Sequence, residues 1–102
     1  MGEEVIVPES FEREQGCTEA EWLRWLPDAV HGHELARPAP DRAEVRVGAG
    51  RLRIDWKVLP PRRIAAIVLP RLHVGFALGG VAEAERERFM KRFDLHLQRG
   101  GG

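Results

Sequence analysis

The sequence has a single cysteine and no tyrosine, and it contains no long run of apolar residues. Cys17 alone can form neither an internal disulfide nor a multi-cysteine zinc site. No segment approaches the roughly 18 apolar residues of a membrane span, and the Met1 end lacks the features of a signal peptide. At 102 residues and 43% apolar composition, the chain is expected to be one cytoplasmic domain, residues 1–102, that is stabilised by packing.

The sequence motifs of the common enzyme classes are also missing. There is no glycine-rich phosphate loop, no GxSxG elbow, no HExxH and no EF-hand pattern. Acidic pairs such as Glu19 with Glu21 are explained as charges in the first turn of a helix. The sequence therefore favours a protein that is not an enzyme, and it indicates no cofactor.

Charge is unevenly distributed along a chain whose net charge is zero. Residues 1–41 carry ten acids and three arginines, whereas residues 42–73 carry eight bases and two acids. A neutral chain has no long-range attraction to nucleic acid or acidic membranes, although a locally basic surface can still hold an anion. We expect the acidic N-terminal part to lie over or beside a basic sheet.

The longest regular pattern runs from Ala43 to Leu78, where apolar and charged residues alternate as they do in strands with one buried face. Turn signals divide it at Gly48–Arg51, as a four-residue hairpin loop, and at Leu59–Arg63. The predicted pairs are Val47 with Leu52, Val45 with Ile54, Val58 with Ile64, Trp56 with Ala66 and Ile54 with Val68. The predicted core face comprises Val45, Val47, Leu52, Ile54, Trp56, Val58, Ile64, Ala66, Val68, Leu72, Val74, Phe76 and Leu78.

Pro70 interrupts this pattern without offering a further hairpin. Proline cannot take the positive φ that tight hairpin turns need at their first position. We therefore expect the strand to bend at Pro70, and Leu72–Leu78 to pair with a segment such as Val5–Val7 or Gly32–Arg37.

Helices are predicted on both sides of the sheet region. Thr18 and Glu21 fit a capping box, which starts a helix at Glu19, and Pro27 is expected to kink or restart it before it ends ahead of Gly32. The apolar positions of this helix are Trp22, Trp25, Leu26, Ala29 and Val30. A second helix is predicted from Val81 to about Leu97, with Val81, Ala84, Phe89, Phe93 and Leu97 inward and Met90 on the flank. A single helical turn is expected around Phe11.

These elements predict an α+β fold. We expect a two-layer sandwich in which an antiparallel sheet of about four strands, a meander of hairpins, carries an N-terminal and a C-terminal helix on one face.

Basic side chains gather on the side of the predicted sheet that faces away from the core. Sheet-type RNA binders stack bases on exposed aromatic rings, but all three tryptophans here fall on predicted core faces. A solvated, charged surface is therefore favoured over a nucleic-acid site. The candidate anion-binding residues are Arg46, Arg51, Arg53, Lys57, Arg62 and Arg63.

An apolar strip lies on the same outward side. Ala65, Ile67 and Leu69 are predicted to project there, next to the basic strands. They form a candidate interface for a partner protein or a second copy, unless the N-terminal segment covers them.

Two further sets of residues can carry chemistry. Cys17 precedes a helix N-terminus, a position that favours a reactive thiolate. His31 and His33 can present two imidazoles to one side, and Cys17 or Glu34 can add a third ligand for zinc or nickel. Two histidines at a helix C-terminus are more often partners of the helix dipole, so no metal site is predicted.

The chain ends in Arg99-Gly100-Gly101-Gly102. This end resembles the terminal Gly-Gly of ubiquitin-like modifiers and sulfur carriers, whose last glycine is activated as an adenylate. The resemblance covers only these residues. Those proteins place a helix between two hairpins, whereas here the hairpins are predicted to be contiguous, so a flexible tail over residues 99–102 is the expected role.

We therefore expect a small, non-enzymatic interaction or accessory module that acts through a protein partner or as a homodimer. The alternative is an anion or nucleic-acid binding module that uses the arginine-rich sheet face. A thiol-dependent enzyme at Cys17 ranks third.

Overall fold

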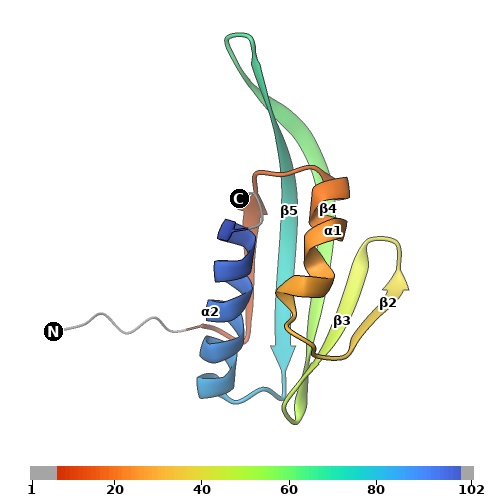
Figure 1. Ribbon diagram of the computed structural model, residues 1–102, viewed down its shortest axis with the longest axis vertical. Helices are drawn as coiled ribbons and strands as arrows, with labels where there is room; N and C mark the ends of the chain where they lie inside the picture. The colour runs from red at the N-terminus through yellow and green to blue at the C-terminus, as the bar shows by residue number, and fades with distance from the viewer. Residues whose placement is uncertain (1–6, 100–102) are drawn as a thin grey trace, which may run out of the picture.

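A computed structural model describes residues 7–99 of the chain. The described part has one antiparallel sheet of five strands, in the order β1-β5-β4-β3-β2, and two helices (Figure 1). The elements are β1 (Ser10–Gln15), α1 (Glu19–Ala29), β2 (Leu35–Ala39), β3 (Arg42–Val47), β4 (Gly50–Ile64), β5 (Ile67–Gly79) and α2 (Glu83–Arg99). The predicted α+β class is confirmed, with five strands instead of about four.

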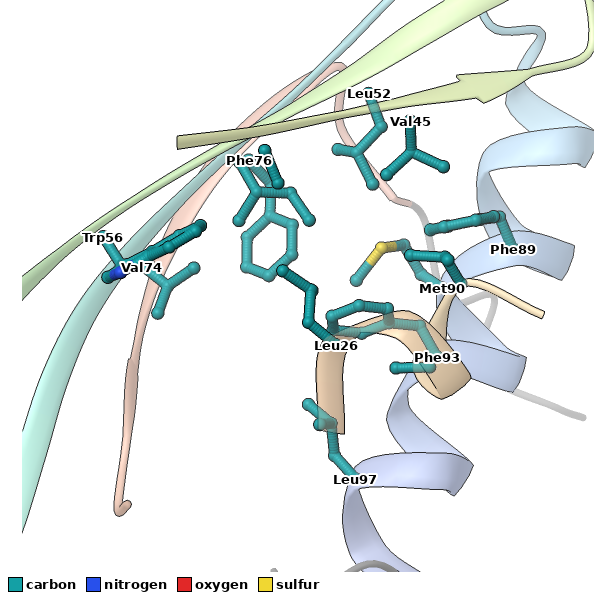
Figure 2. Packing of buried hydrophobic residues seen from close by; sticks show 14 of the residues in the cluster. Leu26, Val45, Leu52, Trp56, Val74, Phe76, Phe89, Met90, Phe93 and Leu97 are labelled. Carbon is teal, nitrogen blue, oxygen red and sulfur yellow. The ribbon is translucent and has the colours of Figure 1, made fainter. Parts of the chain in front are cut away.

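Both helices pack on one face of the sheet and build the core with it (Figure 2). Aromatic rings join the layers: Trp22 of α1 meets Trp56 of β4 edge-on at 5.9 Å between ring centroids, and Phe93 of α2 meets Phe76 of β5 at 5.7 Å. Trp22 and Phe93 also contact each other across the helices. Edge-to-face aromatic pairs add to the free energy of apolar burial, so these rings fix how the helices sit on the sheet.

The start of α1 is as predicted. The Thr18 hydroxyl accepts a hydrogen bond from the Glu21 backbone N–H at 3.1 Å, and the Thr18 N–H donates to the Glu21 carboxylate at 2.9 Å. All five predicted apolar positions of this segment are buried. The helix does not restart at Pro27 but runs through it to Ala29. Because Pro27 lies so near the helix end, only the last turn must accommodate the ring.

The N-terminal segment and the second helix each differ from expectation at one point. The segment around Phe11 is the edge strand β1 and not a helical turn, and Phe11 stacks on Phe76 with ring centroids 4.8 Å apart. The second helix continues past Phe93, and its predicted apolar residues are buried except for Ala84, which is exposed. Residues 100–102 of the glycine tail lie outside the described residues.

The first hairpin lies where it was predicted but is tighter. Val47 pairs with Gly50 across a two-residue turn, so Val45 pairs with Leu52 instead of Ile54. Because the shift is two residues, every side chain keeps its predicted face of the sheet. Gly48 takes a φ of +57°, which this turn requires at its first position.

The second hairpin turns later than predicted. The turn is Ala65-Ala66, with Ile64 opposite Ile67, and Val58 pairs with Leu72. The predicted turn at residues 59–63 is wrong because the two prolines there are absorbed as an irregularity in β4 between Leu59 and Arg62.

The prediction that Leu72–Leu78 pairs with Gly32–Arg37 is wrong. This segment of β5 lies between β4 and β1. Gly32–Arg37 overlaps β2 at the opposite edge of the sheet, and the other predicted neighbour, Val5–Val7, lies largely outside the described residues.

The late turn leaves a two-stranded arm, residues 58–71, beyond the rest of the sheet. β3 ends its pairing with β4 at Asp55, and β1 ends its pairing with β5 at Leu72. Figure 1 shows the arm projecting past the ends of both helices. The core-face prediction is therefore wrong for Val58, Ile64, Ala66 and Val68, which are exposed because no helix covers the arm.

Candidate interaction surface on the arm

The basic residues on the outward sheet face are largely paired with acids. Asp55 sits among them and also accepts a hydrogen bond from Arg42 at 2.7 Å, which raises the pKa of that guanidinium. The candidate anion-binding residues with acidic partners are Arg46 with Glu34 at 3.6 Å, Arg51 with Glu44 at 3.4 Å, Arg53 with Asp55 at 3.6 Å and Arg62 with Glu14 at 3.8 Å. Among the described residues, Lys57 and Arg63 have no such partner.

The structure also separates the six candidate residues in space. Arg46, Arg51 and Arg53 lie on the five-stranded part of the sheet, whereas Arg62 and Arg63 lie on the arm. On the outward face β5 contributes Gly75 and Ala77, which offer no group that binds an anion, and His73, whose Nε2 lies 2.7 Å from the Glu12 carboxylate. The six residues therefore do not converge on one anion site.

The arm presents apolar side chains on both of its faces. Ile64 lies opposite Ile67, and Arg62 lies opposite Leu69, so these four project to one side of the ribbon. Val68, opposite Arg63, projects to the other side. The predicted strip is thus partly assembled: Ile67 and Leu69 lie together, while Ala65 lies in the turn.

The exposure of these side chains is high for their type. The exposed fractions are 58% for Val58, 54% for Ile64, 58% for Ile67, 50% for Val68 and 43% for Leu69. Sequence reasoning missed Val58, Ile64 and Val68 as surface residues, because their strand alternation is the same as that of the core residues. The only signal of a longer ribbon was the lack of a turn at Pro70.

The base of the arm is held to β1. Arg71 donates to the Pro60 carbonyl at 3.0 Å and to the Glu14 carboxylate at 2.9 Å. Glu14 also pairs with Arg62. Partly shielded pairs of this kind contribute little to stability, but together they set the direction in which the arm leaves the sheet.

Prolines restrict how the arm can bind a partner. Pro60, Pro61 and Pro70 lie in its two strands and have no N–H to donate to an added strand. Natural proteins use proline in this way to prevent edge-to-edge pairing. The faces of the ribbon, rather than its edges, are therefore the surfaces available for binding.

The candidate thiol is in an unfavourable place for a nucleophile. Cys17 is 3% exposed. Burial, together with the nearby Glu21 carboxylate, raises the pKa of the thiol from 9.0 to about 11. An activated cysteine needs a shift in the opposite direction.

The two candidate histidines make separate contacts. His31 Nε2 lies 3.1 Å from the Arg92 carbonyl oxygen, and His33 Nδ1 lies 2.7 Å from the Val30 carbonyl oxygen. Glu34, proposed as a further ligand, pairs with Arg46. Within residues 7–99 there is no cluster of three or more side chains placed to hold a metal ion.

A groove along α2 is a feature that the sequence did not predict. Its volume is about 680 Å³. Its lining combines apolar and acidic side chains with one lysine: Val7, Glu83, Glu87, Met90, Lys91, Asp94, Leu95 and Gln98. Leu95 is 44% exposed. Among the described residues outside the arm, it is the one large hydrophobic residue that is exposed.

Comparison of the sequence with protein-family models and with curated proteins gave no match. In residues 7–99, neither helix combines the length and the apolar character needed to cross a bilayer.

Proposed function

We propose that the protein is a non-enzymatic interaction module whose binding element is the β4–β5 arm. The observation that carries this proposal is the concentration of exposed apolar side chains. Of the six large hydrophobic residues that are exposed among the described residues, five lie on the arm. Exposed apolar side chains that gather on one element are a feature of protein contact sites.

The construction of the arm supports binding by a preformed surface. Its strands pair up to the turn, and Arg71 ties its base to β1 through Glu14. A ribbon that is already ordered loses less conformational entropy on binding than a flexible loop does. The arm therefore has the order that a docking element needs.

Binding of nucleic acid by the arm is the second candidate. One observation favours it: from Lys57 to His73 the sequence contains four bases and no acid. Phosphate contacts from lysine and arginine supply most non-specific affinity for nucleic acids. However, Arg62 and Arg71 are already paired with Glu14, and the exposed apolar side chains fit a protein partner better.

Affinity capture with arm variants tests the proposal. The proteins retained by the immobilised wild type are compared with those retained by the Ile67→Lys/Val68→Lys variant, which places two charges on the arm. The matched control is Ala36→Lys, an exposed position in β2 opposite Glu44, where a lysine is well tolerated. Circular dichroism confirms that all three proteins are folded.

We expect specific proteins to be retained by the wild type and by Ala36→Lys but lost with the arm variant. Equal retention by all three proteins would show that the arm is not the binding element. Retention that nuclease treatment abolishes would replace the protein partner with a nucleic acid.

A further inference from the structure

The arm and the α2 groove have complementary chemistry. On one face the arm offers Val68 and Arg63 near its tip, and the groove offers Leu95 beside the carboxylates of Glu83 and Glu87. The whole chain has no net charge. Two copies therefore do not repel each other at long range, and the basic tip of one copy is complementary to the acidic groove of another.

An arm cannot fill the groove of its own chain. Figure 1 shows that it leaves the sheet past the ends of the helices, whereas the groove is lined by Val7 and side chains of α2. Contact between these two surfaces requires two molecules.

We propose that the protein forms a symmetric dimer in which the arm of each copy docks in the α2 groove of the other. This inference rests on the proposed function, because it names the partner that the arm binds. Val68 contacts Leu95 of the second copy, and Arg63, which projects from the same face of the arm as Val68, lies next to its groove acids.

The acids of the groove differ in their availability. Asp94 is held by Arg13 at 2.6 Å, and that guanidinium also lies over the Phe76 ring. Glu83 is exposed and Glu87 is half-buried, and among the described residues neither has a basic partner within ion-pair distance. These two carboxylates are the partners of the incoming Arg63, and among the described residues Lys91 is the only base that lines the groove.

Symmetry makes a small contact sufficient. Strands rise about 3.3 Å per residue, so the seven residues of β4 that lie in the arm, 58–64, give a ribbon roughly 20 Å long. The area that one such ribbon buries in one groove is small compared with the roughly 800 Å² that each partner buries in a standard interface. A two-fold axis produces the contact twice, and the bodies beside the arms add further area.

A charge-swap experiment tests the dimer. One variant reverses the tip charge, Arg63→Glu, and the other reverses the groove charges, Glu83→Arg/Glu87→Arg. Each variant alone places like charges at both contacts, so we expect its dimer dissociation constant to rise at least about tenfold in sedimentation velocity. In an equimolar mixture of the two variants, both contacts of the mixed dimer are complementary, and dimers are expected to return.

The outcomes separate the dimer from the more general proposal. A wild type that stays monomeric throughout the micromolar range overturns the dimer. A wild-type dimer that both charge reversals leave unchanged also overturns it. If dimers form only after residues 1–6 are removed, the groove belongs to the chain's own N-terminal segment and the inference fails. In each of these cases, arm-dependent capture of a different protein would still support the proposed function.

Discussion

The same two strands behave differently along their lengths. Between Gly50 and Trp56, and again between Leu72 and Gly79, alternate side chains of β4 and β5 are buried under the helices. In the arm the same alternation continues, yet Val58 and Val68 are at least half exposed. The pattern of residues is alike in both regions, and the difference is the presence or absence of a covering layer.

This comparison shows what strand alternation means physically. An alternation of apolar and polar residues with a period of two predicts that a strand has an apolar face. Burial also requires another element that packs on that face. Here the helices contribute Trp22, Leu26 and Phe93 to the covered half, and neither helix extends over the arm. Exposed apolar residues in the arm therefore add little to the stability of the fold and leave apolar surface open to contact with other molecules.

The largest expected difference between the two regions is in the stability of leucine variants in β5. Leu72 is fully buried and Leu69 is 43% exposed, three residues earlier in the same strand. We expect Leu72→Ala to lower the free energy of unfolding by about 2–5 kcal/mol, because it removes buried methyl groups and leaves a cavity. Leu69→Ala should change it by less than about 0.5 kcal/mol.

Urea unfolding followed by tryptophan fluorescence measures both values. The experiment is done at dilute protein concentration, so that any self-association does not add to stability. Comparable losses in the two variants would mean that the arm is packed against the body in solution, contrary to the structure.

The sequence predicted the covered half well and the arm poorly, for identifiable reasons. The core-face residues from Val45 to Trp56 are correct even though the hairpin register is off by two, because a shift of two preserves the face. The arm was missed because its turn consists of two alanines, and Ala65 takes a φ of +54° that alanine rarely adopts. Prolines 60 and 61 offered a turn signal at the wrong place.

The candidate sites show the same division. The sequence correctly placed Ile67 and Leu69 on a surface, because their alternation opposes that of the core. It did not foresee that Arg46, Arg51 and Arg53 would each lie beside an acid. The partner of Arg46 is Glu34, which precedes β2, and the partner of Arg51 is Glu44 on β3. Asp55, the partner of Arg53, lies two residues further along the same strand. The α2 groove depends on how Val7 lies against the helix, which no local pattern shows.

The reactivity of a thiol is expected to differ between the buried Cys17 and an exposed position on the arm. Because the pKa of Cys17 is raised to about 11 from 9.0, its thiolate fraction at pH 8 is roughly 100-fold below that of an ordinary thiol. The folded state favours the protonated thiol, so its contribution to stability is complete below pH 9 and declines as the pH rises towards 11.

We therefore expect iodoacetamide to modify Cys17 about 100-fold more slowly than a cysteine introduced by Ile67→Cys in the same molecule. Peptide mass spectrometry after timed quenching measures both rates. Equal rates at the two sites would show that the helices do not shield Cys17 as the structure indicates.

Close backbone packing is a further property of the covered half. A Cβ at Gly50 would lie 2.4 Å from the Gly79 carbonyl oxygen, which is backbone and cannot move aside easily. We expect Gly50→Ala to destabilise the fold by about 1–3 kcal/mol, as overpacking does. Gly75→Ala is the matched control, because nothing lies within 4 Å of its added Cβ; it should be neutral or stabilising by up to about 1 kcal/mol. Thermal unfolding of both variants tests this.

The helix that covers the sheet depends in turn on its cap. Replacing Thr18 by alanine removes the hydroxyl that accepts the Glu21 N–H, and we expect a loss of about 1 kcal/mol. Thr18→Ser keeps the hydroxyl and should retain most of the stability. If both variants unfold at the same denaturant concentration as the wild type, then the start of α1 does not limit how the helix covers the core.

The smallest effect is expected at the arm turn. A positive φ at the first turn position alone is the type II′ pattern, which favours glycine, and Ala65 has such a φ. Ala65→Gly relieves backbone strain but increases the freedom of the unfolded chain, and the arm adds little to the core. We expect the free energy of global unfolding to change by less than about 0.5 kcal/mol, while the amides of Ile64 and Ile67 exchange more slowly with deuterium. A large change in global stability instead would mean that the arm folds as part of the core, and the distinction between the two halves of β4 and β5 would be lost.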